Sequence, residues 1–292
     1  MAEVTAALVK ELREMSGAGM MECKKALVAA NGDINLAMDE MRKAGQAKAD
    51  KKSGRTAAEG VVTVECSADN KRVVMVEINS ETDFVARDQN FMGFVKDVGT
   101  GVLTSGVSRF EEFSSVSLPN GQTIELARQN LITKIGENIN IRRAEIIDSQ
   151  GVVGAYVHNN RIGVIVDLDG GNPALAKDIA MHIAASSPMV ILPSEVPQAL
   201  LDKEKEIFIA QAEGSGKPKD IIEKMTEGRL RKYLEEVSLV GQPFVKDPSQ
   251  KVGDLLKAQQ ASVRSFIRFE VGEGIEKVEV DFVKEVMEQA KA

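Results

Sequence analysis

The sequence predicts an α+β fold, with an N-terminal three-helix module followed by a duplicated core in which antiparallel hairpins are each followed by a helix. Three observations support this prediction. Residues 1–45 carry apolar side chains at helical spacing. From Gly60 onward, short runs rich in Val and Ile, separated by turn residues, replace that spacing. The same pattern then begins again at Gly151, 91 residues later.

The composition is that of a folded, acidic protein. Of the 292 residues, 43% are hydrophobic and 28% are charged, and the length allows about two domains of ~100–200 residues. The formal net charge of −7 argues against an extensive basic surface for nucleic-acid phosphates. With 10 Phe, 2 Tyr and no Trp, few side chains are available to stack on bases. No direct nucleic-acid partner is therefore expected.

Residues 1–45 are expected to form three short helices. Thr5 supplies an N-cap hydroxyl for the first, and the Gly-rich stretch 16–19 separates it from the second. Asn31-Gly32 ends the second helix in a left-handed cap, Asp33 caps the third, and Gly45 is expected to end it. Because three such short helices enclose a very small core, this module is expected to depend on a partner or on the rest of the chain.

Residues 46–59 have no apolar stripe and carry Lys48, Lys51, Lys52 and Arg55. We interpret them as a linker or a solvated helix end, because a few bases in so short a span are commonly just exposed to water.

The core is expected to contain two copies of one α+β unit, over 60–148 and 149–275. Each copy begins with two β-rich strands around a turn, continues with a helix and closes with a later strand. The paired segments are 60–62 with 151–153, the turns at Asn70 and Asn160, 73–76 with 162–166, and the closing strands 141–145 with 267–270.

Two further helical regions are predicted. Residues 195–236 form an insertion in the second copy, with two amphipathic helices joined at Gly214–Gly216, and such a short connection predicts a protruding antiparallel hairpin. Pro218 suits the first position of the return helix. Beyond the core, apolar spacing after Asp281 predicts a C-terminal helix within 276–292.

The usual catalytic, cofactor and metal motifs are missing. Gly216-Lys217 does not complete a phosphate loop, because Gln211 stands in place of the first Gly and Pro218 in place of Ser or Thr. His158, expected at an exposed turn, and His182, expected within a helix, have no second ligand at metal-binding spacing. Neither a cofactor nor a bound metal is expected.

The sequence also predicts a cytoplasmic location without a membrane partner. The first residues lack a basic segment followed by an apolar run, so no signal peptide is expected. The uncharged stretch Ile179–Pro193 is too short to span a membrane. Cys23 and Cys66 form no disulfide or zinc pattern, and each is expected to be a small buried side chain in a reducing compartment.

The segment 79–87 allows two interpretations. Ser80 followed by Asp83 has the spacing of a capping box, and it would open a long helix. In the first interpretation one face of this helix is buried, with Phe84, Phe91, Val95 and Val98. Alternatively, Asp83 and Phe84 lie at an exposed helix start and face a partner. The spacing alone leaves both interpretations open.

Motifs spread over the whole chain resemble one known family. They are Val9–Leu27, Thr82–Val85, Lys134–Arg143, Gly216–Pro218, Gly241–Val245 and Phe266–Lys277. In sequence and in order they are similar to the signatures of the bacterial elongation factor Ts family. Local departures are Glu81, where many members have Gln, and Met15-Ser16, where many have Arg-Thr.

The resemblance implies a guanine-nucleotide exchange factor that performs no covalent chemistry. It would bind elongation factor Tu, both GDP-bound and nucleotide-free, and promote GDP release and GTP loading by disturbing the magnesium and phosphate site of that GTPase. The family's fold would make residues 1–45 similar to a ubiquitin-associated domain.

The resemblance also implies roles for individual residues. Asp83 and Phe84 would form a wedge that displaces the support of the magnesium ion, with Thr82 capping their helix and Val85 packing beneath. Further contacts to the GTPase would come from Met20, Met21, Ile135, Gly136 and His158.

Apart from the resemblance, two other classes stay open. An adaptor for ubiquitin-like partners would carry its affinity in residues 1–45 alone. An enzyme would have a small-molecule pocket between the duplicated halves, with perturbed carboxylates or a catalytic base.

Overall fold

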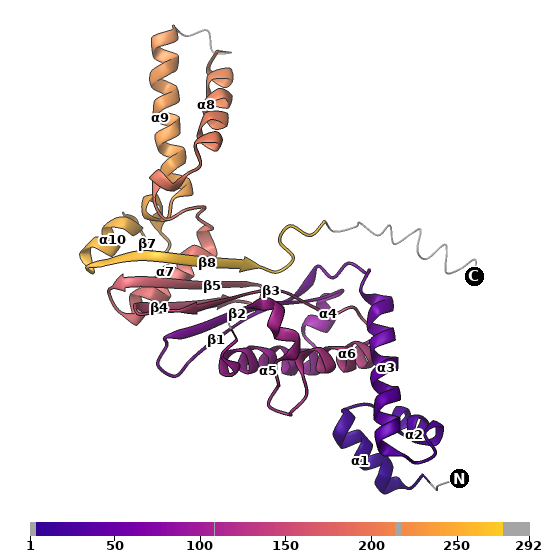
Figure 1. Cartoon of the computed structure of the whole chain (residues 1–292). Coiled ribbons are helices and arrows are strands. Elements are labelled where there is room, and N and C mark those ends of the chain that lie inside the picture. Colours follow the sequence, from indigo (N-terminus) through magenta and orange to yellow (C-terminus); the bar gives the residue numbers. More distant parts are fainter. Residues whose placement is uncertain (1–3, 108, 214–217, 277–292) are drawn as a thin grey trace. The chain divides into compact units, whose positions relative to one another are not determined.

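The computed structural model describes residues 4–107, 109–213 and 218–276 (Figure 1). Three N-terminal helices are followed by antiparallel sheets and further helices, which confirms the α+β class. The chain divides into two compact units. The first holds the residues up to 65, 74–146 and the residues from 270, and the second holds 66–73 and 147–269.

The N-terminal helices are α1 (Ala6–Ser16), α2 (Met20–Ala29) and α3 (Ile34–Lys52). Their predicted caps are confirmed: the Thr5 hydroxyl accepts from the Leu8 N–H at 3.3 Å, and the Asp33 carboxylate accepts from Asn35 N–H at 2.9 Å. The small core predicted for them is also present, and its buried members are Val9, Leu12, Cys23, Leu27, Ala30 and Ala37.

The expected stop at Gly45 is wrong, because α3 continues to Lys52. A glycine inside a helix costs only about 1 kcal/mol relative to Ala, which good helix formers on either side can offset. Gly45 is buried, and a Cβ there would lie 3.9 Å from Thr133 Oγ1 and 4.0 Å from Gln129 Cβ. These are ordinary van der Waals distances, so α3 packs against helix α6 (Ile124–Ile135) at this point with room for a small side chain.

The first unit is built on a three-stranded sheet in the order β1 (Glu59–Cys66), β2 (Arg72–Ser80) and β3 (Asn140–Asp148). Helices α5 (Gln89–Ser105) and α6 pack with it around one core. Alternate β2 residues Val74, Val76 and Ile78 enter this core, since side chains of a strand alternate between its faces. The two strands of the predicted hairpin and the closing strand are confirmed, whereas α6 was not predicted.

The expectation that Ser80 opens one long helix is wrong. The structure has a short helix, α4 (Asp83–Ala86), capped by Thr82, and then a separate α5 capped by Asp88. The Asp88 carboxylate accepts from the N–H groups of Asn90 and Phe91 at 2.8 and 3.2 Å, so it restarts the helix. Phe84 consequently lies outside the buried face that Phe91 occupies.

The second unit holds a sheet in the order β4 (Val152–His158), β5 (Ile162–Gly170) and β8 (Ala261–Glu270). Strands β4 and β5 pair antiparallel from Val152 opposite Leu168 to His158 opposite Ile162. Helix α7 (Pro173–Ser186) packs on them, and its residues Ile179 and Ile183 are fully buried. These elements confirm the strands and the helix predicted for this region.

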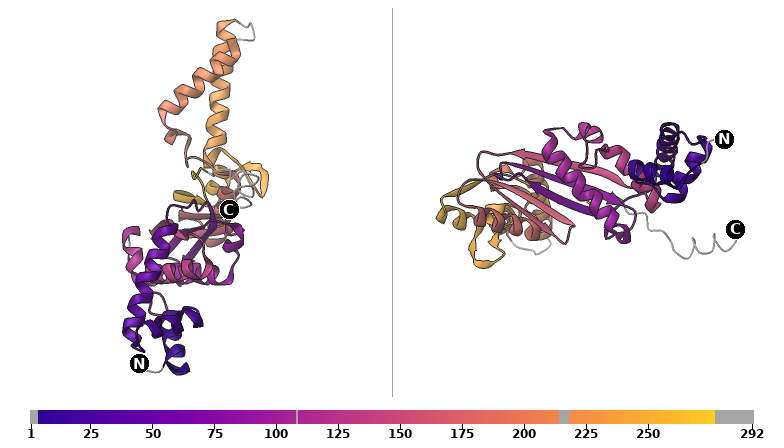
Figure 2. Two further views of the ribbon diagram at one scale, coloured as in Figure 1. Left: turned by 90° about the vertical axis from the view of Figure 1, so that its right-hand side faces the viewer. Right: turned by 90° about the horizontal axis from the view of Figure 1, so that it is seen from below.

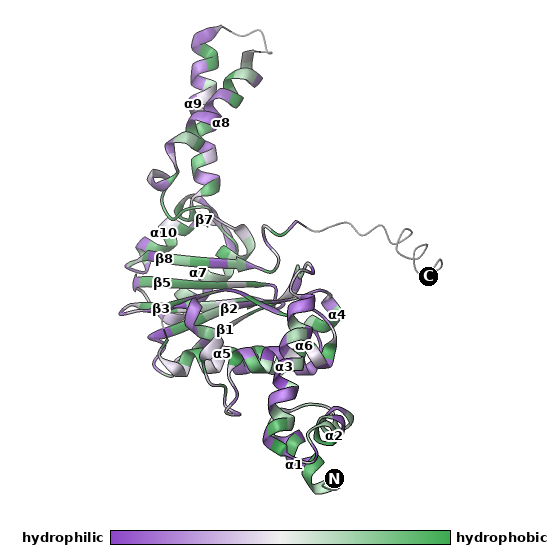
Figure 3. Ribbon diagram, turned by 45° about the vertical axis from the view of Figure 1, so that its right-hand side comes forward, coloured by the Kyte–Doolittle hydropathy of each residue, from purple (hydrophilic) through white to green (hydrophobic). Residues whose placement is uncertain are grey.

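Two helices of the second unit, α8 (Gln198–Glu213) and α9 (Lys219–Val237), pack against each other in opposite directions (Figure 2). Both carry hydrophobic residues interspersed with hydrophilic ones (Figure 3). The Arg229 guanidinium lies 5.8 Å from the centre of the Phe208 ring and links the pair. The expected connection at Gly214–Gly216 lies outside the described residues.

The rest of the second unit was not predicted. It consists of β6 (Pro243–Phe244), β7 (Asp247–Lys251), α10 (Val252–Ala258) and two short 3-10 helices, η2 (Pro193–Glu195) and η3 (Leu239–Gly241). The expected C-terminal helix over 276–292 falls, from residue 277 on, outside the described residues. One cysteine prediction is wrong: Cys23 is buried, but Cys66 is exposed because it ends β1 beside the Ser67–Asn70 turn.

Candidate functional site

The predicted signature lies on α4, a single helical turn that directly follows β2. Thr82 has an extended backbone, and its hydroxyl accepts from the Val85 N–H at 3.4 Å, which confirms the expected cap. At the other end, Arg87 N–H donates to Phe84 O at 3.2 Å, and Asp88 N–H donates to Val85 O at 2.9 Å. The turn is thus closed by hydrogen bonds at both ends.

Two consecutive side chains of this turn have opposite environments. Phe84 is 80% exposed, whereas Val85 is 8% exposed and belongs to the core of the first unit. Val85 therefore attaches the turn to the core while Phe84 projects into solvent. The interpretation of Phe84 as a core residue is wrong, and of the two interpretations the exposed helix start is confirmed.

Asp83 lies beside Phe84 and is partly exposed. Its carboxylate pairs with the Arg87 guanidinium at 2.9 Å, one turn later in the chain. An exposed pair with this spacing contributes only about 0.3–0.5 kcal/mol. Asp83 can therefore exchange Arg87 for another partner at little cost.

A pair of carboxylates holds the chain just before α4. Glu137 Oε2 accepts from the N–H groups of Glu81 and Thr82 at 3.1 and 3.0 Å, and its Oε1 accepts from the Thr82 hydroxyl at 2.7 Å. In the opposite direction, Glu81 Oε1 accepts from Asn138 N–H at 2.5 Å, and Glu81 Oε2 pairs with Arg55 at 2.8 Å. The segments 81–82 and 137–138 are therefore bound to each other reciprocally.

The other predicted contact residues lie on several elements. Met20 and Met21 begin α2 and are 59% and 65% exposed. Ile135 ends α6 and packs partly buried on the core, and Gly136 follows it with a φ of 88°. His158 ends β4 in the second unit and is exposed, as predicted. Ile135 and Gly136 directly precede Glu137, whose carboxylate binds the backbone and hydroxyl of Thr82.

Comparison with known proteins gives one consistent result. The family model described as elongation factor TS matches residues 81–273. Elongation factor Ts of Legionella pneumophila (strain Paris) is 57% identical over 291 residues, covering 100% of both chains. The same factor of Alcanivorax borkumensis is 58% identical over 97% of this chain and 100% of its own length, and that of Francisella tularensis subsp. novicida is 55% identical over 100% of both.

The chain belongs to the elongation factor Ts family. It is accordingly a nucleotide exchange factor for elongation factor Tu in translation elongation, and not an enzyme. The resemblance inferred from the sequence motifs is thereby confirmed over the full chain.

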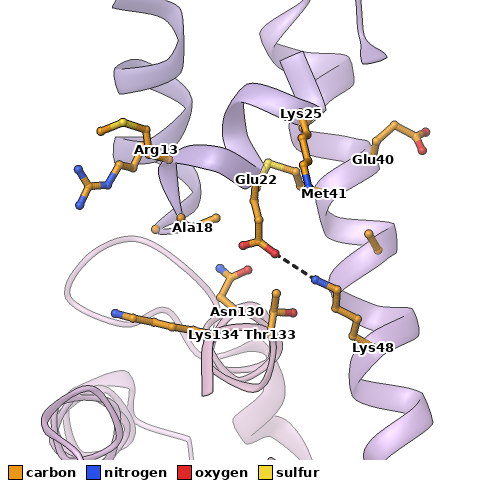
Figure 4. Close-up of a pocket in the computed structure, with 16 residues that line it drawn as sticks. Arg13, Ala18, Glu22, Lys25, Glu40, Met41, Lys48, Asn130, Thr133 and Lys134 are labelled. Atoms are coloured by element: carbon orange, nitrogen blue, oxygen red, sulfur yellow. Dashed lines mark hydrogen bonds and ion pairs between the residues drawn. The ribbon is translucent and has the colours of Figure 1, made fainter. Parts of the chain in front are cut away.

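One cavity of the first unit is drawn in Figure 4. It measures about 890 Å³ and lies between the N-terminal helices and α6. Its two carboxylates have cationic partners, since Glu22 pairs with Lys48 at 3.1 Å and Glu40 with Lys43 at 2.9 Å. None of the 16 described residues that line it is His, Cys or Asp, so it offers few groups for acid–base or metal chemistry.

Two further observations concern only the described part of the chain. There, no three or more His, Cys, Asp or Glu side chains gather as a metal site would require. In the same residues, no helix combines the length and the apolar character needed to cross a bilayer.

Sequence reasoning missed Glu81 and Glu137 as parts of the site. Each is a lone carboxylate in the sequence, separated from the other by 56 positions. The available signals were the place of Glu81 directly before Thr82 and the presence of Glu137 in the Lys134–Arg143 motif, and neither indicated the hydrogen-bond partners of these carboxylates.

Proposed function

We propose that the wedge, Asp83 and Phe84, is the part of this exchange factor that opens the nucleotide site of elongation factor Tu. The observation that supports this is the 80% exposure of Phe84 on a turn anchored by the buried Val85. Burying a Phe side chain stabilises by about 1.5–3 kcal/mol, and the free chain leaves this contribution unused. The contribution is available only when Phe84 inserts into a partner.

The free energy available from burying Phe84 is large enough for an exchange mechanism. A GTPase holds its nucleotide through a Gly-rich phosphate loop and a magnesium ion, so displacing their support weakens the nucleotide. Factor and nucleotide then weaken each other by the same factor, because the coupling between two binding sites is reciprocal. A 100-fold weakening corresponds to about 2.7 kcal/mol, which is comparable to burying one Phe.

The remaining assignments are parts of the same proposal. Met20 and Met21 grip the nucleotide-binding domain, and Met suits this role because it is flexible and polarizable. Ile135, Gly136 and His158 contribute further contacts. The chain acts in the cytoplasm on the GDP-bound and nucleotide-free GTPase, without a nucleic-acid or membrane partner.

We also propose the domain organisation inferred from the sequence. It comprises a ubiquitin-associated-like module (1–45), a linker (46–59), two copies of the core unit (60–148 and 149–275), a protruding hairpin inserted in the second copy (195–236), and a C-terminal helix (276–292).

Duplication of the core unit is supported by matching glycines and acids. A Cβ on Gly60 would collide with Ile78 O, and a Cβ on Gly151 with Leu168 O. In both cases the glycine approaches the central strand of its own three-stranded sheet. One residue before each of these carbonyls stands a buried carboxylate, Glu77 on β2 and Asp167 on β5.

Release of labelled GDP from elongation factor Tu tests the mechanism. At saturating concentration, Phe84→Ala is expected to accelerate release much less than the parent chain. An equal acceleration by both would exclude the wedge. A module of residues 1–45 that carried the whole affinity would instead favour the adaptor class, and turnover of a small molecule by the chain alone would favour the enzyme class.

A further inference from the structure

The turn that carries Phe84 is too short to maintain its own geometry. Helix α4 has four residues, and the first turn of a helix fixes several backbone dihedrals for a single hydrogen bond. The N–H groups at the start of any helix also lack partners within that helix. The direction in which Phe84 projects must therefore be set by groups outside α4.

Glu137 is the group best placed to do this. Its carboxylate is the acceptor for both N–H groups at residues 81 and 82 and for the Thr82 hydroxyl, with distances of 2.7–3.1 Å. A threonine hydroxyl has one proton, and donation to Glu137 leaves its lone pairs for the Val85 N–H. Glu137 therefore also orients the cap of α4.

Glu137 is itself held in place by contacts of its neighbours in the chain. Glu81 binds the backbone of Asn138, the residue after Glu137, and the side chain of Asn138 donates to Arg55 O at 2.8 Å. Asn138 is buried, and its neighbour Ile139 belongs to the core. Glu137 is thus held between the ordered end of α6 and the core, and it can transmit that order to α4.

We propose that Glu137 is a positioning residue for nucleotide exchange, which fixes the direction of Phe84 while Phe84 is pressed against the GTPase. This inference rests on the proposed wedge function of Asp83 and Phe84. Glu137 acts through Thr82 and the turn. Its loss should therefore lower the maximal rate of GDP release and leave the affinity for the GTPase almost unchanged.

Three variants of the full chain test the role in labelled-GDP release. Glu137→Ala removes all three acceptor contacts, and we expect the saturating rate to fall about tenfold, which is less than the ~100-fold that a 1 Å misplacement of a positioned group can cost. The concentration for half-maximal effect should change less than about threefold. Glu137→Gln keeps an oxygen for the two N–H groups and an amide that can donate to Thr82, so it should retain most of the rate. Glu137→Asp, one methylene shorter, should lose part of it.

Asp33→Ala is the matched control. It also removes a carboxylate that accepts from two backbone N–H groups, at 2.9 and 3.0 Å, but these begin α3 and do not touch α4. We expect a comparable loss of thermal stability and a saturating rate equal to that of the parent. If Asp33→Ala and Glu137→Ala lowered the rate equally, Glu137 would be only a stabilising residue.

A double-variant cycle separates this inference from the wedge itself. If Glu137 acts through Phe84, Glu137→Ala should lower the rate in the parent but hardly at all in a Phe84→Ala background. A slow Phe84→Ala with a fully active, folded Glu137→Ala would overturn the positioning role and leave the wedge intact. A fully active Phe84→Ala would overturn the wedge. If Glu137→Ala does not fold, Glu137→Asp decides, and a parental rate for it would overturn the role.

Discussion

Phe84 and Val85 are consecutive residues with opposite environments: 80% of Phe84 is exposed, against 8% of Val85. One residue of helix rotates a side chain by about 100°, so a single turn can present one side chain to solvent and bury the next. The proposed wedge function at Phe84 is thereby separated from the attachment to the core at Val85. Substitutions at the two positions should therefore separate exchange from folding.

Phe84→Ala should leave the free energy of unfolding within about 0.5 kcal/mol of the parent, because the side chain is largely exposed. The rate of GDP release at saturating factor should fall strongly, and binding to the GTPase should persist. Urea unfolding and stopped-flow release of labelled GDP measure the two effects. Asp83→Ala should behave similarly, since its exposed pair with Arg87 contributes little.

Phe110→Ala is a useful control for these variants. Phe110 also belongs to the first unit and is 37% exposed. The centre of its ring lies 5.4 Å from the centre of the Phe113 ring. Its loss should affect stability and leave release unchanged. A large fall in stability for Phe84→Ala, with unchanged exchange per folded molecule, would contradict the wedge.

Val85→Ala should show the opposite behaviour. Removing two buried methyl groups is expected to lower the free energy of unfolding by about 1–3 kcal/mol. Because Val85 attaches α4 to the core, its loss should make the turn less ordered. The rate of GDP release at saturating factor should therefore fall, but less than in Phe84→Ala. A Val85→Ala variant with parental stability in urea unfolding would show that α4 is not anchored through this residue.

The comparison at α4 shows what a sequence pattern can and cannot predict. The two readings of Phe84 followed from local spacing, since helical periods involve neighbouring residues, but that spacing placed the cap at Ser80. The signature and the Thr82 cap were implied only by the resemblance to the family. The choice between those readings depended on Asp88, which ends one helix and starts another with two hydrogen bonds. Asp, Asn and Ser favour several local conformations, so spacing alone did not reveal which of them would cap α5.

Contacts between residues far apart in the sequence were the second feature that could not be predicted. The predicted end of α3 at Gly45 failed because the packing against α6 decides there, and α6 was itself not predicted. The contacts of Glu137 with residues 81 and 82 likewise join segments more than 50 residues apart. By contrast, the β1–β2 and β4–β5 hairpins were predicted correctly, because turn residues and alternating strands are adjacent in the chain.

Met20 and Met21 should contribute affinity and not the maximal rate. A double Met→Ser variant is expected to raise the concentration of factor for half-maximal GDP release about tenfold, equivalent to about 1.4 kcal/mol. The saturating rate should stay that of the parent. Substitution is preferable to deleting residues 1–45, because α3 runs on to Lys52 and a deletion would cut it.

Leu36→Ser provides the control for this pair. Leu36 is a similarly exposed apolar residue of the N-terminal helices, at 47%. It should leave the half-maximal concentration unchanged. A lower saturating rate for the methionine variant would show that these residues take part in the exchange step itself.

His182 predicts a pH dependence of stability. It is fully buried on α7, with its Nε2 2.9 Å from Gln242 Oε1, and its Nδ1 accepts from Val245 N–H at 3.1 Å. The Gln242 amide is oriented by its donation to Glu236 O at 2.7 Å, so its oxygen faces the ring. Nε2 therefore carries the proton and Nδ1 does not, and a second proton would break the bond from Val245.

Burial lowers the pKa of His182 below its ordinary value of 6.5, and the hydrogen bond with Gln242 offsets this effect only in part. The unfolded chain thus binds a proton that the folded chain excludes. This contribution to stability is complete above pH 6.5 and is lost as the pH falls below it, by at most about 1.4 kcal/mol per pH unit.

Buried Glu77 titrates in a different range. Burial raises its pKa, but hydrogen bonds from Gly272 N–H and from the side chains of Arg143, Asn79 and Arg142 outweigh burial and hold the pKa below 4.5. Its stabilising contribution is present above pH 4.5 and is lost only as the pH falls below that value. A change in the free energy of unfolding between pH 5 and pH 6.5 is therefore expected to come mainly from His182.

Urea unfolding of the parent chain should show stability falling from pH 6.5 to pH 5, and His182→Gln should flatten this dependence whatever its stability at neutral pH. The chain has only one other histidine, His158, which is exposed, so His158→Gln is a matched control that should keep the parental slope. If the parent lost no stability over this interval, or if His158→Gln abolished the slope, the buried neutral ring would not be its source.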